Sequence, residues 1–129
     1  EHRAIIRELA ASPKGAEVTC ASGSMEPTIP VGTVVRIHAL PLEELRIGDV
    51  LLFEAGNGTY LLHRVVLFSP RRHWFLHIGD APTPAGPRRA LCKEIVGRAD
   101  LARRRPPAEV YWQAAQRLAR TVWRSRNSA

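Results

Sequence analysis

Long hydrophobic runs are missing from this sequence of 129 residues. A helix that spans a bilayer needs about 20 consecutive apolar residues, and no stretch approaches that length. The secretory pattern of a basic start, an apolar middle and a small-residue cleavage site is also absent. We therefore expect the chain as given to be soluble and cytoplasmic, or membrane-associated if an anchor precedes Glu1.

Cysteine is equally scarce. The two cysteines, Cys20 and Cys92, have no metal-binding or redox spacing, and the five histidines form no ligand cluster with them. We predict that both cysteines are small buried hydrophobic residues, and a single disulfide between them stays open as an alternative. The sequence predicts neither a metal site nor a cofactor.

Acidic residues are few only near the C-terminus. Residues 1–97 hold 11 basic and 10 acidic residues, whereas residues 98–129 hold 8 arginines and 2 acidic residues. The net charge of +7 therefore belongs mainly to the C-terminal end. Because the body of the chain is nearly neutral, we do not expect nucleic acid as its partner.

Short extended segments separated by turns dominate the rest of the chain. An amphipathic pattern predicts a short helix over residues 3–11, with an apolar face formed by Ile5, Ile6, Leu9 and Ala10. Alternating and β-branched segments predict strands at 17–21, 33–38, 50–54, 59–68, 73–78 and 91–99. Residues 79–87, rich in Pro and Gly, predict a loop. The pattern is typical of a mainly β domain of about six mostly antiparallel strands.

A proline pair at 106–107 marks the end of this domain. We place the β-domain at residues 1–105, with its core at 17–99, and a basic helical tail at 106–129. An amphipathic helix is predicted at 109–124 within this tail. Its apolar face can pack on the domain, or the tail can dock to a membrane surface or a partner protein.

The segment Ser-Gly-Ser-Met-Glu-Pro-Thr-Ile at residues 22–29 has the features of a nucleophile turn. A serine nucleophile needs a constrained turn, a base, and donors for the oxyanion. Gly23 lets the backbone pass tightly before Ser24, and Pro27 stiffens the backbone after it. The backbone N–H of Ser24 and the hydroxyl of Ser22 are the candidate oxyanion donors.

This segment resembles the nucleophile box of type I signal peptidases, in which the Ser before Met is the nucleophile and the earlier Ser assists the oxyanion hole. The same Ser-Met pair opens the related LexA-like self-cleaving domains. Later segments resemble successive boxes of the family in the same order, at residues 48–53, 62–66, 79–80 and 95–98. The resemblance covers residues 17–99 and implies the coiled antiparallel β-sheet of the signal-peptidase/LexA type.

The resemblance places the general base at His63, which Arg64 follows. The common bacterial enzymes use Lys at this place, whereas the archaeal, endoplasmic-reticulum and sporulation-type branch uses His. Only Lys14 and Lys93 occur in the chain, and neither lies on the strand expected to carry the base. Histidine suits the role because its ordinary pKa of about 6.5 leaves it largely neutral at neutral pH.

In an extended strand, His63 shares a face with Leu61 and Val65, so we expect it to project from an apolar, partly dry surface. His77 is the rival base, because it lies just before the Gly-Asp pair at 79–80. We rank it second, since it lacks the Leu-His-Arg-Val context.

The orienting carboxylate of the predicted triad is Asp80. The resemblance implies that it orients His63 or neutralises its charge. The sequence departs from the family here, because relatives usually carry a second Asp shortly after this one and residues 81–89 hold no carboxylate. Asp49 is a less favoured substitute, which we interpret as a structural turn residue.

The resemblance implies a serine endopeptidase that removes a signal or leader segment from a precursor polypeptide after small residues. The substrate would bind as an extended strand, with Met25 and Pro27 among its contacts. Two alternatives stay open: a LexA-like self-cleaving domain, whose usual Ser–Lys pair this chain does not match, and a catalytically weak peptide- or membrane-binding module of the same fold.

Overall fold

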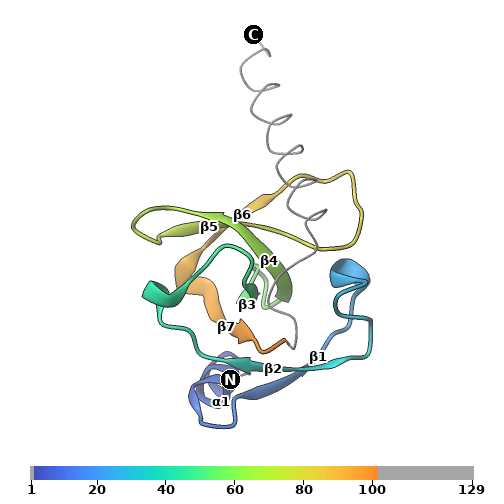
Figure 1. Ribbon diagram of the computed structural model, residues 1–129. Coiled ribbons are helices and arrows are strands. Elements are labelled where there is room, and N and C mark those ends of the chain that lie inside the picture. Colours follow the sequence, from blue (N-terminus) through green and yellow to red (C-terminus); the bar gives the residue numbers. More distant parts are fainter. Residues whose placement is uncertain (1, 102–129) are drawn as a thin grey trace.

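A computed structural model describes residues 2–101 of the chain (Figure 1). It contains one helix, α1 (His2–Ala11), and three 3-10 turns, η1 (Gly23–Met25), η2 (Leu42–Glu44) and η3 (Cys92–Glu94). The strands in this part of the chain are β1 (Ala16–Thr19), β2 (Val34–His38), β3 (Val50–Glu54), β4 (Tyr60–Phe68), β5 (Trp74–Ile78), β6 (Arg88–Leu91) and β7 (Ile95–Ala99). The helix predicted at 109–124, and with it the tail at 106–129, lies outside the described residues.

All the strands described belong to one sheet with the order β1-β2-β7-β3-β4-β5-β6. Each pair of neighbours is antiparallel. The prediction of a mainly antiparallel β domain with a short N-terminal helix is therefore confirmed. Strands β1 and β6 form the two edges of the sheet.

One predicted strand is wrong. The segment 91–99 is not a single strand: β6 ends at Leu91, η3 follows, and β7 begins at Ile95. β6 pairs with β5 at the edge, whereas β7 lies between β2 and β3. The apolar pattern hid the break because Cys92, within the turn, is buried as a strand residue would be.

Both faces of strand β3 are covered by buried side chains. Val50 and Leu52 belong to one buried cluster and Leu51 and Phe53 to another, which explains the continuous apolar run at 50–53. The helix-side cluster comprises Ala10, Ala16, Cys20, Met25, Ile29, Val35, Ile37, Val50, Leu52, Leu62, Val96 and Ala99. The aromatic cluster comprises Leu45, Leu51, Phe53, Val65, Phe75, Cys92 and Ile95.

Helix α1 uses only part of its predicted apolar face. Ala10 is buried in the helix-side cluster and Ile6 packs against it. Ile5 and Leu9 remain 55% and 50% exposed, so they are not core residues in the part of the chain described.

Cys20 and Cys92 are both buried and free, one in each cluster, as predicted for small apolar residues. Among residues 2–101, no three His, Cys, Asp or Glu side chains are grouped so as to hold a metal ion. No helix within the same residues is long and apolar enough to cross a membrane.

Gly97 sits where β7 passes β2 at close range. A Cβ built on Gly97 would lie 2.3 Å from the backbone oxygen of His38, which cannot move aside as a side chain can. We expect Gly97→Ala to lower the free energy of unfolding by about 1–3 kcal/mol, the usual cost of overpacking, as measured by denaturant unfolding. The matched control is Gly23→Ala, whose Cβ would come close to the flexible carboxyl end of Glu26 and not to backbone. An equal loss in both variants would contradict this explanation.

Candidate active site

The predicted nucleophile, Ser24, lies in the 3-10 turn η1. The turn is anchored from behind, because Met25 is fully buried in the helix-side cluster and its carbonyl accepts the Ile29 N–H at 2.9 Å. On the outer side, the Ser22 and Ser24 hydroxyl oxygens are 3.1 Å apart. This contact places the Ser22 hydroxyl, the predicted oxyanion donor, beside the hydroxyl of Ser24, the predicted nucleophile.

The loop after β5 closes on this turn. The Ala81 N–H donates to the Ser24 carbonyl at 3.0 Å. A Cβ on Gly79 would lie 2.3 Å from the same oxygen, so only glycine permits this approach. Figure 1 shows the β1–β2 connection and the β5–β6 loop on one side of the molecule. The first residue of the Gly-Asp pair at 79–80 thus positions the nucleophile turn.

A buried ion pair ties four segments together at this point. Arg64 donates to Asp80 through Nε at 2.8 Å and through a terminal nitrogen at 2.6 Å, and both side chains are almost fully buried. The other terminal nitrogen of Arg64 donates to the Gly48 carbonyl at 2.8 Å. The Thr28 hydroxyl donates to Asp80 at 2.5 Å. Strand β4, the turn before β3, the nucleophile segment and the β5–β6 loop therefore meet at one ion pair.

These contacts differ from those that the sequence predicts for Asp80. Its carboxylate bonds with Arg64 and Thr28, and no hydrogen bond joins it to His63 among the described residues. Burial lowers the pKa of His63, and the negative charge of Asp80, acting through space, offsets part of that lowering. The orienting role of Asp80 stays a prediction, now limited to this electrostatic effect.

His63 instead contacts His77. The Nδ1 atoms of the two rings are 2.9 Å apart, and the ring centroids are 5.1 Å apart. His77 lies opposite Val65 in the β4–β5 pairing. His63 and Val65 share one face of β4, as predicted, so the two histidines are diagonal neighbours on that face.

Both imidazoles border the aromatic cluster. The His77 ring is 4.6 Å from the Phe53 ring and 5.8 Å from the Phe75 ring, and the residue is only 4% exposed. Burial, followed by the charges of His63 and Arg88, lowers the pKa of His77 to about 4. Burial is also the main cause that lowers the pKa of His63, with Arg88 acting in the same direction. Both rings are therefore neutral at neutral pH.

One cavity of about 340 Å³ is lined by Ser24, His63 and His77 together. Its remaining wall comes from the end of β5 and the loop after that strand, and includes Arg88. The predicted nucleophile and base thus lie on the same cavity although they are far apart in the sequence. No hydrogen bond joins Ser24 to His63 within residues 2–101; such catalytic contacts often tighten only with substrate bound.

Other predicted site residues lie off this cavity. Met25 is a core residue and Pro27 is exposed, and neither lines the cavity. Their contacts with substrate stay a prediction. The sequence interpretation missed three participants: Thr28, Arg88 and the pairing of His77 with His63. The only sequence signal for the last was the presence of His77 beside the Gly-Asp pair.

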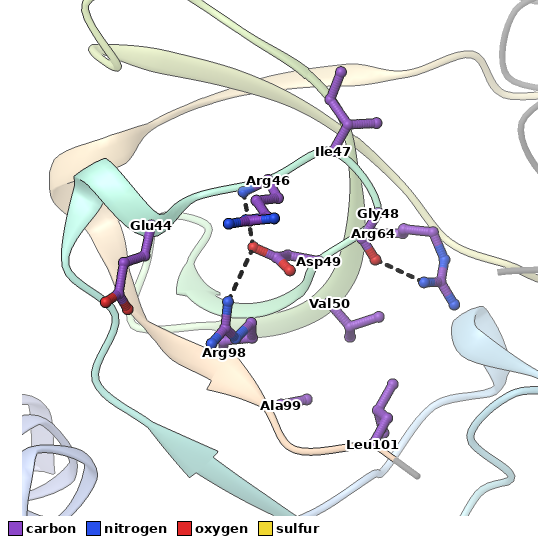
Figure 2. A pocket seen from close by; sticks show the side chains of 10 residues that line it. All are labelled: Glu44, Arg46, Ile47, Gly48, Asp49, Val50, Arg64, Arg98, Ala99 and Leu101. Carbon is purple, nitrogen blue, oxygen red and sulfur yellow. Dashed lines mark hydrogen bonds and ion pairs between the residues drawn. The ribbon is translucent and has the colours of Figure 1, made fainter. Parts of the chain in front are cut away.

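A larger cavity of about 610 Å³ lies beneath the turn before β3 (Figure 2). Two of the charged residues that line it, Asp49 and Arg98, form an ion pair. Asp49 accepts the Arg46 backbone N–H at 2.9 Å and lies 3.6 Å from Arg98, while Arg64 bonds to the Gly48 carbonyl. Since no Ser, Cys or His in the described part of the chain lines it, its size does not make it the better candidate. These contacts agree with the prediction that Asp49 is a structural turn residue.

The Arg64–Asp80 pair gives a stability prediction. Breaking a buried pair leaves an uncompensated charge and costs about 3–5 kcal/mol. We expect Asp80→Asn and Arg64→Met each to lower the free energy of unfolding by about that amount, and the double variant to lose less than the sum of the two. Denaturant unfolding of the four proteins measures this coupling.

The matched control is Glu17→Gln, which breaks the exposed Arg36–Glu17 pair at 2.6 Å. Exposed pairs contribute about 0–1 kcal/mol. If Asp80→Asn and Glu17→Gln cost the same, or if the single losses at residues 64 and 80 simply add, the ion pair does not have the structural role assigned to it.

Comparisons with protein-family models, with curated proteins and with solved structures found no match for this chain.

Proposed function

We propose that this chain is a serine endopeptidase of the signal-peptidase type, in which Ser24 is the nucleophile and His63 the general base. The observation that carries the proposal is the single cavity lined by both residues. The 3.1 Å contact between the Ser22 and Ser24 hydroxyls adds support, because it keeps a second donor beside the nucleophile. The finer fold assignment, a coiled sheet of the signal-peptidase/LexA type, belongs to the same proposal.

The chemistry derives from these positions. His63 accepts the Ser24 proton while the Ser24 oxygen bonds to the scissile carbonyl carbon. The Ser24 N–H and the Ser22 hydroxyl donate to the resulting oxyanion. His63 then gives its proton to the leaving nitrogen as the C–N bond breaks. Water, deprotonated by His63, attacks the acyl-enzyme, and the Ser24 oxygen recovers the proton as the new carboxyl group leaves.

The expected substrate is an extended polypeptide with small side chains beside the cut. A cavity of about 340 Å³ is near the lower end of the range of about 300–1,000 Å³ for ligand pockets. This volume can take one or two side chains of a bound polypeptide. The preference for small residues beside the cut comes from the resemblance to signal peptidases and not from the size of the cavity.

The self-cleaving alternative has less support. That class uses a Ser–Lys pair, and neither lysine of the chain lines the cavity. Lys14 is exposed at the end of the α1–β1 connection, and Lys93 is exposed in η3. The binding-module alternative rests on the basic tail, which lies beyond the residues described.

The first test is cleavage of a mixed peptide library, read by mass spectrometry. We expect the wild-type protein to cut after small residues. Ser24→Ala should abolish cleavage, and His63→Ala should lower the rate by about 10²–10⁴-fold, the usual contribution of a general base. Ser22→Ala should lower it by about 10²-fold, as for loss of one oxyanion donor.

The matched control is His73→Ala, because His73 is exposed and does not line the cavity. It should retain wild-type cleavage. Cleavage by Ser24→Ala at the wild-type rate would disprove the proposal, and so would a wild-type protein that cuts no peptide in the library.

The pH dependence gives an independent test. Only neutral His63 can accept the Ser24 proton, so kcat/KM falls as pH drops through the pKa of His63. Since burial lowers that pKa below 6.5, we expect the acid limb of kcat/KM to lie below pH 6.5. Rates on one library peptide between pH 4 and 8 measure it.

Arg88→Gln should move this limb to higher pH, because the Arg88 charge lowers the pKa of His63. Arg89→Gln is the matched control, since Arg89 is an exposed neighbour that does not line the cavity. An acid limb above pH 6.5, or equal shifts in the two variants, would argue against His63 as the base.

A further inference from the structure

The candidate site has no free carboxylate to orient its base. The cavity that holds Ser24 and His63 has no Asp or Glu in its wall, as far as residues 2–101 define it. The carboxylate whose charge acts on His63 is that of Asp80, and both of its oxygens already bond with Arg64. A histidine base still needs one ring nitrogen held so that the other faces the nucleophile.

A β-bulge brings a different group into that position. In the part of β4 near the turn, Phe68 pairs with Phe75 and Leu67 with Leu76; beyond a register shift, Val65 pairs with His77. The residue that the shift skips is Val66. Without this bulge, His77 would lie opposite Val66 and on the other face of the sheet from His63, because a register shift of one residue exchanges the two faces.

We propose that His77 is the positioning residue of this site: its neutral imidazole accepts a hydrogen bond from Nδ1–H of His63, where serine peptidase triads use a carboxylate. The proposal rests on the Ser24/His63 function above. Its basis is the 2.9 Å separation of the two Nδ1 atoms, the burial of His77 and the shared cavity.

The proton inventory assigns donor and acceptor. To take the Ser24 proton, His63 must have a free Nε2, so its own proton is on Nδ1. The His77 Nδ1 then carries no proton and accepts, and its ring proton is on Nε2. When His63 becomes positively charged, its Nδ1–H still donates to His77, and the proton taken from Ser24 leaves through Nε2 to the departing amine. No proton passes to His77.

The surroundings keep His77 in the accepting form. Its ring packs against Phe53 of β3 and Phe75 of β5, which leave it little access to water. The charged groups that act on the pair are Arg88 of β6, which disfavours protonation of both rings, and Asp80, which favours protonation of His63. A proton therefore goes to His63 before His77.

Substitutions at residue 77 test the proposal in the peptide-cleavage assay. The Oδ1 of Asn can occupy the place of Nδ1, because both atoms are bonded to Cγ, whereas Phe keeps the ring volume without an acceptor. We expect His77→Asn to keep kcat/KM within about tenfold of wild type and His77→Phe to lose on the order of 10²-fold. KM should change little in either variant.

The His77→Asp variant distinguishes a hydrogen bond to His63 from a role in packing alone, because it changes the pH dependence of kcat/KM. It differs from His77→Asn only in charge, and a carboxylate within hydrogen-bond reach raises the pKa of an imidazole by about 1–3 units. The acid limb of kcat/KM should therefore lie at least about 1 pH unit higher in the Asp variant than in the Asn variant. Thermal unfolding of all three variants checks that they are folded.

A measurement without substrate keeps the two proposals separate. In wild-type protein labelled with ¹⁵N-histidine, a scalar coupling across the hydrogen bond should connect the Nδ1 nuclei of His63 and His77, with His63 in its Nδ1–H form. His73→Phe should keep this coupling and His77→Phe should lose it.

The outcomes are distinct. A wild-type protein that cuts nothing overturns the proposed function, whatever the coupling shows. An active wild type overturns the role of His77 if His77→Phe is as active, if no coupling is seen, or if the Asp and Asn variants share one acid limb. If His63→Asn is active while His77→Asn is not, the roles of the two histidines are exchanged and the proposal is wrong.

Discussion

The buried pair of Arg64 and Asp80 is the contact on which the geometry of the site depends. Arg64 follows His63 on β4, and Asp80 follows Gly79, whose backbone touches the nucleophile turn. Burying two charges costs several kcal/mol of desolvation, so such a pair is not favoured for its stability alone. Here it fixes position: because Arg64 also bonds to the Gly48 carbonyl and Asp80 to Thr28, a shift in any one of the four segments would leave a buried charge or hydroxyl without a partner.

Strand β4 serves two purposes because its side chains alternate. Arg64 points to the side of the sheet that holds the ion pair, and His63 points to the side that holds the aromatic cluster. The same two adjacent residues thus connect the structural contact to the candidate base. The bulge at Val66 shifts the register between β4 and β5 by one residue. As a result, Val65 and Phe68 face the same cluster as Phe75 and His77, although they are an odd number of residues apart.

Much of this fold could be predicted from local pattern. β2, β3, β4 and β5 match the predicted strands to within one residue at each end, because alternating apolar residues and Gly- or Pro-rich turns mark them in the sequence. The prediction of a single strand at 91–99 was wrong because the buried Cys92 continues the apolar pattern through a turn. At the site, the sequence indicated Ser24 and His63. It did not indicate that Arg64 forms an ion pair with Asp80, or that His77 contacts His63. Both contacts depend on how the strands are paired, and the contact between the histidines also depends on a β-bulge that leaves no local signal in the sequence.

The two carboxylate tasks of a serine peptidase triad, holding the histidine and balancing its charge, are separated in this arrangement. Asp80 can balance charge only from a distance, and its own charge is largely offset by Arg64. His77 can hold the ring but adds no negative charge. A histidine base in such surroundings is weaker than one bonded to a carboxylate. Burial lowers the pKa of His63, however, so a larger fraction of it is neutral at neutral pH, and general-base efficiency depends on both quantities. In the proposed peptidase, the larger fraction of neutral His63 therefore partly offsets the loss in basicity.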